Sequence, residues 1–265
     1  MKTVLLKLSG KALDNLFVND SLIKIIKDLK DSFDDLVIVH GAGTKISEWC
    51  RTIMGKESKF YNGQRVTDES TMEVVVAVQA GLLNAKFVSR LQTHQINSIG
   101  LTGVDNGLFT AEHFNENLGY VGVPVLTGNK DWLHSIMENR IVPVFSSVCR
   151  DRKGNLMNIN ADIFSKELAI AIEADTVLFL SDINGIKLNG SLQTEINELD
   201  IEEGILKGEI TDGMIPKLQS CLELIQNGIH KVWIGSDLSN QNFKGLFSEN
   251  NMKGTWIVKS KAVAV

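Results

Sequence analysis

The sequence predicts an α/β protein: a three-layer αβα sandwich with a mainly parallel central sheet, divided into two lobes. Short apolar runs rich in strand-forming residues alternate with stretches of helical periodicity along the chain. The strand-like runs are continuously apolar, which is typical of parallel sheets that helices cover on both faces. A length of 265 residues suffices for one large α/β domain or for two lobes that share a sheet.

The first half of the chain is expected to alternate strands and helices. The predicted order is strand 3–8, helix 21–33, strand 36–40, a turn at 62–67, helix 70–94 and small hairpins within 98–126. The long helix is apolar around much of its circumference, so it belongs either to the core or to a subunit contact.

The second half continues the alternation. The predicted order is helix 131–138, strand 141–147, hairpin turn 151–154, helix 163–172, strand 176–180, a helix that ends at 226, and strands 231–234 and 255–258. Thr211 or Asp212 is a good N-cap for the helix that ends at 226. No linker rich in proline or serine separates domains, and we expect the boundary between the lobes near residue 173.

Composition excludes several classes of protein. The net charge is −5, with no basic stripe that would indicate nucleic-acid binding. Lys7 interrupts the first apolar run too early for a signal peptide, and no apolar run is expected to cross a bilayer. Cys50, Cys149 and Cys221 are widely spaced, which predicts reduced, buried thiols in a cytoplasmic protein without metal-binding cysteines. The five histidines show no ligand spacing.

Small residues follow the first two predicted strands. Ser9-Gly10 and Gly41-Ala42-Gly43 would let backbone amides approach an anion, and the helix that follows each would add its positive end. The second segment lacks the third glycine of the dinucleotide fingerprint, and no stretch has P-loop spacing. A tight strand-to-helix turn remains the alternative.

Three charged residues allow both a plain and a functional interpretation. Asp162 at a helix start is either an N-cap or a functional carboxylate. Arg65 is either a surface salt-bridge residue or a fork that grips a carboxylate with two hydrogen bonds. Lys217 is either a solvated helix lysine or part of a site.

Five segments in this order resemble the amino acid kinase family, and together they span nearly the whole chain. They are Lys7-Leu8-Ser9-Gly10, His40-Gly41-Ala42-Gly43, Asn62-Gly63-Gln64-Arg65-Val66-Thr67, Asn158-Ile159-Asn160-Ala161-Asp162 and Ile210-Thr211-Asp212-Gly213-Met214-Ile215-Pro216-Lys217. Within the family, the set is similar to members that phosphorylate the side-chain carboxylate of N-acetyl-L-glutamate during arginine biosynthesis. Two positions depart from the family pattern, since Ser9 and Ala42 stand where glycines are usual.

The resemblance implies a role for each matched position. Lys7 and Lys217 would flank the transferring phosphoryl group, and Asp162 would hold both ammonium groups in place. Backbone amides of Ser9, Gly10, Ala42 and Gly43 would bind phosphoryl oxygens. The acylated amino acid would contact Gly41, Ala42, Gly43, Arg65, Asn158 and Asn160, with Arg65 on its α-carboxylate.

The resemblance also implies two lobes with separate tasks. Residues 1–172 would bind the acylated amino acid and form the dimer, and residues 173–265 would bind ATP, with Mg²⁺ held mainly by the phosphates and no protein metal ligands. The nucleotide site would be lined by Ser181, Asp182, Gly185, Ile186, Glu209, Ile210, Thr211 and Met214.

The chemistry of a carboxylate acceptor agrees with these roles. A γ-carboxylate has a reference pKa of about 4.3 and is already ionised at neutral pH, so Asp162 is better understood as an organiser than as a base. Three alternatives stay open: N-succinyl-L-glutamate as substrate, the substrate of another amino acid kinase, and a non-catalytic effector-binding protein on the same fold.

The sequence also predicts an oligomeric state. Arginine-inhibited members of the family carry an additional N-terminal helix, whereas this sequence begins directly on its first predicted strand. We therefore expect a homodimer without arginine feedback, joined through the apolar helix at 70–94.

Overall fold

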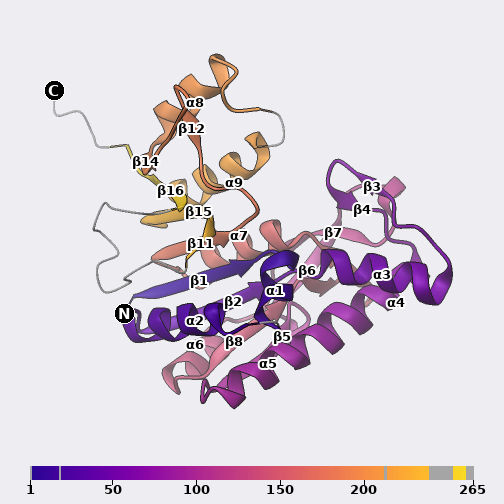
Figure 1. The fold of residues 1–265 in the computed structure, drawn as a ribbon. Helices are drawn as coiled ribbons and strands as arrows, with labels where there is room; N and C mark the ends of the chain where they lie inside the picture. The colour runs from indigo at the N-terminus through magenta and orange to yellow at the C-terminus, as the bar shows by residue number, and fades with distance from the viewer. Residues whose placement is uncertain (1, 18, 212–213, 239–252, 261–265) are drawn as a thin grey trace.

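A central sheet of eight strands organises the molecule (Figure 1). The computed structural model describes residues 2–17, 19–211, 214–238 and 253–260. Neighbouring strands are parallel except for β15 and β16, which confirms the predicted mainly parallel sheet. In spatial order the strands are β14 (Glu195–Ile196), β16 (Lys253–Val258), β15 (Lys231–Asp237), β11 (Thr176–Leu180), β1 (Thr3–Leu8), β2 (Asp35–His40), β8 (Val142–Ser146) and β5 (Ser98–Thr102).

Helices cover both faces of this sheet and make two apolar cores. Along β1, Leu5 belongs to one core, whereas Leu6 and Leu8 belong to the other, because successive side chains of a strand point to opposite faces. One core includes residues of α6 (Asp131–Glu138), α7 (Ala161–Ala171), α8 (Glu198–Leu206) and α9 (Ile215–Gln226). The other includes residues of α1 (Gly10–Leu16), α2 (Ser21–Ser32), α3 (Gly43–Met54), α4 (Glu69–Val75) and α5 (Asn84–Thr93).

The region predicted as small hairpins is only partly hairpin. Residues 98–102 form β5, which lies parallel to β8 in the main sheet. The hairpin follows it, and β6 (Phe109–His113), β7 (Val121–Leu126), β9 (Val148–Arg150) and β10 (Leu156–Ile159) close a small barrel. The prediction of hairpins was wrong for β5, because the short apolar runs of this region are interrupted by Gly and Asp and do not read as a strand of the main sheet.

The long apolar helix was predicted with nearly correct ends. It runs from Glu69 to Thr93 as α4, a π-helical segment η1 (Val76–Leu83) and α5. The helix has 25 residues, and an 18-residue window within it has a mean hydropathy of 1.3, which reaches that of a membrane span, contrary to the expectation that no segment would. This composition is only a weak sign of a membrane span, because 44% of the apolar window is buried in the protein and core helices of soluble proteins have the same composition.

Three further differences concern short elements. Helices α1 and α8 were not predicted, and α9 begins at Ile215 with Met214 at its N-cap position. Thr211 is therefore not the N-cap, although its carbonyl accepts hydrogen bonds from the amides of Met214 and Ile215. Asp212, the alternative cap, lies outside the described residues. Two small hairpins complete the fold: β3 (Phe60–Tyr61) with β4 (Gln64–Arg65), and β12 (Lys187–Leu188) with β13 (Ser191–Leu192).

Candidate active site

The carboxyl ends of three adjacent strands bring the candidate residues together. Strand β1 lies between β2 and β11, and Leu8 is in register with both His40 and Leu180. The segments that follow these strands contain Ser9-Gly10, Gly41-Ala42-Gly43 and Ser181. The first two touch, since a Cβ added to Gly10 would lie 3.2 Å from the Gly43 nitrogen. Ligands of parallel α/β sheets bind at this edge.

Lys7 and Asp162 form an ion pair at this edge of the sheet. The Lys7 Nζ lies 2.5 Å from Asp162 Oδ1, and the two side chains are 8% and 29% exposed. Asp162 is not the N-cap of α7, because Asn160 fills that position and accepts a hydrogen bond from the Asp162 amide at 2.8 Å. The Asp162 carboxylate is thereby left available for ammonium groups.

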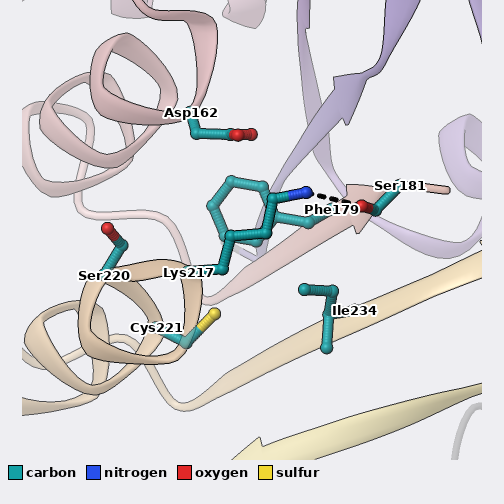
Figure 2. Close-up of a pocket in the computed structure, with 7 residues that line it drawn as sticks. All are labelled: Asp162, Phe179, Ser181, Lys217, Ser220, Cys221 and Ile234. Atoms are coloured by element: carbon teal, nitrogen blue, oxygen red, sulfur yellow. Dashed lines mark hydrogen bonds between the residues drawn. The ribbon is translucent and has the colours of Figure 1, made fainter. Parts of the chain in front are cut away.

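Lys217, on helix α9, lines a pocket together with Asp162 (Figure 2). Its Nζ donates a 2.8 Å hydrogen bond to the hydroxyl of Ser181, which follows β11. Burial tends to raise the pKa of Asp162, but the charge and hydrogen bond of Lys7 and the charge of Lys217 outweigh burial and hold that pKa below its usual value. The pocket is lined by Asp162, Phe179, Ser181, Lys217, Ser220, Cys221 and Ile234.

Arg65 is a buried cation rather than a surface salt-bridge residue. It is 6% exposed, lies over the Phe60 ring at 4.6 Å, and burial lowers the pKa of its guanidinium. The guanidinium donates to Gly43 O at 2.8 Å, to Ser47 Oγ at 3.0 Å and to Ser58 Oγ. These bonds occupy three of its five N–H groups and include no carboxylate among the described residues. A buried cation without a carboxylate partner favours an anionic ligand.

Asn158 is connected to Arg65 through Thr67. The Asn158 Nδ2 donates to Thr67 Oγ1 at 3.1 Å, and that hydroxyl donates to the Arg65 carbonyl at 2.8 Å. The structure therefore brings the third and fourth of the five matched segments together. Thr67 stood within a matched segment, but no pattern in the sequence assigned it this linking contact.

The residues predicted to line the nucleotide site differ in how far they are exposed to solvent. Ile186 is fully buried, and its amide donates to Thr255 Oγ1 while its carbonyl accepts from the Gln193 amide. Ile210 is also a core residue, and its amide donates to the Gly204 carbonyl. The Glu209 carboxylate accepts a 2.9 Å hydrogen bond from the Asn189 amide. Gly185 has φ +106, and a Cβ there would lie 2.8 Å from Thr255 Oγ1, so the turn requires glycine. Asp182 and Thr211 are exposed, whereas Ser181 is buried and Met214 half-buried.

The three thiols agree with the sequence prediction in being buried and unpaired. Cys50, Cys149 and Cys221 are unpaired and buried, and burial raises the pKa of Cys149 and Cys221. No group of three or more His, Cys, Asp or Glu side chains within the described ranges is arranged to hold a metal ion.

Comparison with known proteins places this chain in a family. The model of the amino acid kinase family matches residues 2–236, which is most of the chain. The chain belongs to the amino acid kinase family. This confirms the resemblance that the five segments carried.

Curated relatives of this amino acid kinase are similar over most of their length. It is 36% identical over 246 residues to the acetylglutamate kinase of Clostridium acetobutylicum, covering 87% of this chain and 81% of that protein. It is 34% identical over 239 residues to that of Brachyspira hyodysenteriae, covering 88% and 82%. For that of Bacillus licheniformis, the identity is 32% over 262 residues and 98% of each chain.

Solved structures share the fold. The structure of smu.665 from Streptococcus mutans UA159 has a TM-score of 0.79 and 27% identity, covering 97% of this kinase and 98% of that chain. Carbamate kinase from Giardia lamblia bound to AMP-PNP has a TM-score of 0.65 and 15% identity, covering 98% and 99%. The second likeness shows the fold alone.

Proposed function

We propose that this amino acid kinase transfers the terminal phosphoryl group of ATP to the γ-carboxylate of N-acetyl-L-glutamate. The product would be N-acetyl-L-glutamyl 5-phosphate, an intermediate of arginine biosynthesis, and the reaction would take place in the cytoplasm. One observation carries the proposal: Lys7 is paired with Asp162, and Lys217 lines the same pocket. The names of the curated relatives support the choice of substrate.

The two lysines would act on charge that develops during transfer. Both reactants are anions, and the transition state spreads negative charge over the equatorial phosphoryl oxygens. Lys7 and Lys217 supply positive charge from two different elements, β1 and α9. Asp162 orients Lys7 by direct contact and favours Lys217 by charge. Preorganised donors of this kind are commonly the largest catalytic contribution.

Backbone amides and two side chains would bind the remaining groups. The turn at residues 41–43 lies against Gly10 and opens the 12-residue helix α3, whose N-terminal amides suit phosphoryl oxygens. The two remaining N–H groups of Arg65 would hold the α-carboxylate of the substrate, and Asn158 would contact the acylated amine or its acyl group. The Ser9 amide donates to the Leu180 carbonyl at 3.1 Å, so we assign the phosphoryl oxygens to the amides of Gly10, Ala42 and Gly43 and not to that of Ser9. Ala42 keeps a backbone amide, so this departure from the family pattern leaves the proposal intact.

The lobe formed by residues 173–265 would bind ATP, and residues 1–172 would bind the acylated amino acid. Among the described residues, Asp162 is engaged by Lys7 and no carboxylate cluster accompanies it. This donor set suits a Mg²⁺ ion carried by the phosphates of ATP rather than by the protein. When bound, Mg²⁺ would neutralise phosphate charge.

An assay of ADP release over a panel of acids tests the proposed function. N-acetyl-L-glutamate is expected to stimulate ADP release in the presence of Mg²⁺ far more than N-succinyl-L-glutamate, L-aspartate or carbamate. A preference for N-succinyl-L-glutamate would reassign the acyl group. If no acid stimulated ADP release while ATP bound normally, the non-catalytic alternative would replace the enzyme.

Arg65→Lys is expected to weaken binding of the acylated amino acid without affecting ATP. Lysine keeps the charge but lacks the planar fork, and charged hydrogen bonds contribute roughly 1.5–3 kcal/mol each. The KM for N-acetyl-L-glutamate should therefore rise about 10–100-fold, measured by initial rates at saturating ATP. Ser47→Ala, which removes one partner of Arg65 but not the fork, is the control. Equal increases in both KM values would contradict the assignment.

The long helix offers a surface for a homodimer. Its outer face exposes Ala77, Gly81 and Ala85, spaced four residues apart, beside half-buried Val76 and Leu82. Small residues at this spacing allow two helices to approach closely. A cavity beside this face is lined by Glu69, Met72, Glu73, Val76, Ala77, Tyr120, Asn155 and Leu156. We propose that two copies of the chain join through this face.

Gly81→Arg is expected to convert a dimer into a monomer. A Cβ added at Gly81 meets only Val76 O at 3.6 Å, so the variant chain keeps room for its own fold while the new side chain blocks the face. Light scattering of wild type should give twice the mass of the variant, and circular dichroism should be the same for both. A wild-type monomer, or a dimer that persists in the variant, would contradict this interface.

A further inference from the structure

A buried polar cluster lies beneath the turn at residues 41–43. His40, Gln79, Asn84 and Ser147 are each 0–5% exposed, and they belong to β2, the long helix and the residue after β8. The Gln79 Nε2 donates to Ser147 Oγ at 2.8 Å and to the His40 carbonyl at 3.3 Å. The His40 ring packs edge-on against Phe87 with centroids 5.9 Å apart. Of these four residues, only His40 lies in one of the five matched segments.

The hydrogen bonds of the His40 ring determine which nitrogen carries the proton. The Asn84 Nδ2 donates to the Val144 carbonyl at 2.9 Å, which identifies this atom as the amide nitrogen. The same nitrogen lies 3.0 Å from His40 Nε2, so Nε2 must accept. The other ring nitrogen, Nδ1, lies 3.2 Å from the Gly41 carbonyl and must donate. Burial lowers the pKa of His40 to about 4, partly opposed by the bond to Gly41, which agrees with a neutral ring.

These contacts fix two successive peptide units of the turn. The His40–Gly41 unit is held at both ends, because its carbonyl accepts from Gln79 and its amide donates to Leu8 O at 3.2 Å. The Gly41–Ala42 unit is held at its carbonyl by the His40 ring. A trans peptide is planar, with its C=O and N–H pointing in opposite directions. The ring therefore turns the Ala42 N–H away from itself.

The far side of the turn faces the candidate active site. A Cβ added to Gly41 would lie 3.7 Å from the Ala161 Cβ, and Ala161 precedes Asp162. Gly10 approaches Gly43 and the Ala42 carbonyl carbon from the loop after β1. Within the described residues, the Ala42 amide donates to no acceptor, so it remains available to a bound anion.

We propose that His40 is a positioning residue for phosphoryl transfer: its ring, locked by Asn84 with the proton on Nδ1, holds the Gly41–Ala42 peptide so that the Ala42 N–H points at the reacting oxygens. This rests on the proposed function and adds to it a residue that touches no reactant. It also assigns a task to the fully buried histidine, whose plain alternative is an apolar filler beside Phe87.

Two substitutions of His40 distinguish a ring that positions the Gly41–Ala42 peptide from a ring that only fills space beside Phe87. His40→Asn places an amide N–H near the former Nδ1 but loses ring volume, whereas His40→Phe keeps the ring but cannot donate to Gly41 O. Positioning predicts that His40→Phe lowers kcat/KM about 10²-fold, as small misplacements of binding groups do, and that His40→Asn recovers most of the loss. If the His40 ring only fills space, His40→Phe should be more active than His40→Asn, and the activity of each variant should follow its melting temperature. That order of activities, or equal losses, would overturn the proposal.

A measurement without substrate keeps the test independent of the proposed function and of variant folding. Nitrogen-15 NMR of the wild-type imidazole rings should show His40 neutral at neutral pH, with the proton on Nδ1. A proton on Nε2 would overturn the positioning role even if the enzyme were fully active. If wild type released no ADP with any acid, the proposed function would fail, while the tautomer would still decide whether the ring holds the turn.

Discussion

Replacing Lys217 with alanine is expected to lower kcat about 10²–10³-fold, as the loss of one preorganised donor to a transition state usually does. The Lys217 ammonium is held by the Ser181 hydroxyl and lines the pocket that Asp162 enters (Figure 2). Its task arises only when charge accumulates on the phosphoryl oxygens, so the KM for either substrate should change much less than kcat. Steady-state kinetics of ADP release measures both parameters.

Ser220→Ala is the matched control for this substitution. Ser220 lies on the same helix and lines the same pocket, but its hydroxyl donates to the Pro216 carbonyl at 3.1 Å. The control should keep nearly wild-type kcat, and both variants should melt near the wild-type temperature. An equal loss of kcat in the two variants would contradict a specific role for the Lys217 ammonium, because any change on this face of α9 would then have the same effect.

Replacing Lys7 with methionine is expected to lower kcat by a similar factor and, unlike the previous change, to destabilise the fold. Methionine fills the space on β1 but leaves the Asp162 carboxylate without its ion-pair partner. Breaking a buried pair costs roughly 3–5 kcal/mol, and the 29% exposure of the Asp162 side chain should reduce this to about 1–3 kcal/mol. Denaturant unfolding at neutral pH measures the loss.

The stability difference between wild type and Lys7→Met should depend on pH. In wild type the pKa of Asp162 is held below its unfolded value, so its ion pair stabilises the fold at neutral pH. That contribution is lost as pH falls through the folded-state pKa of Asp162, because the folded protein must then bind the proton. The difference should therefore be largest near neutral pH and shrink in acid. A difference that grew in acid would contradict the pairing.

The sequence predicted the strands around the site well because parallel strands are continuously apolar. The runs at 3–8 and 176–180 are β1 and β11 with the expected ends, and the sheet brings their carboxyl ends together. Strand β5 was not recognised, since Gly100 interrupts its short apolar run. Helix periodicity succeeded for 131–138, which is α6.

The site was predictable as a set of residues but not as a set of contacts. Spacing placed Asp162 at a helix start, yet only the structure shows that Asn160 takes the cap and frees the carboxylate for Lys7. The link from Asn158 through Thr67 to Arg65 could not be predicted from local patterns, because Asn158 and Thr67 are 91 residues apart in the sequence. The His40 ring was hidden for the same reason, because its partner Asn84 lies 44 residues away.

The most direct test is a crystal structure of the kinase with Mg²⁺, a non-hydrolysable ATP analogue and N-acetyl-L-glutamate. We predict γ-phosphate oxygens about 3 Å from the Nζ atoms of both Lys7 and Lys217, with the ion pair to Asp162 retained. The acceptor carboxylate should lie in line on the opposite side of the phosphorus. A triphosphate bound away from either lysine, or a carboxylate that cannot approach it, would contradict the account.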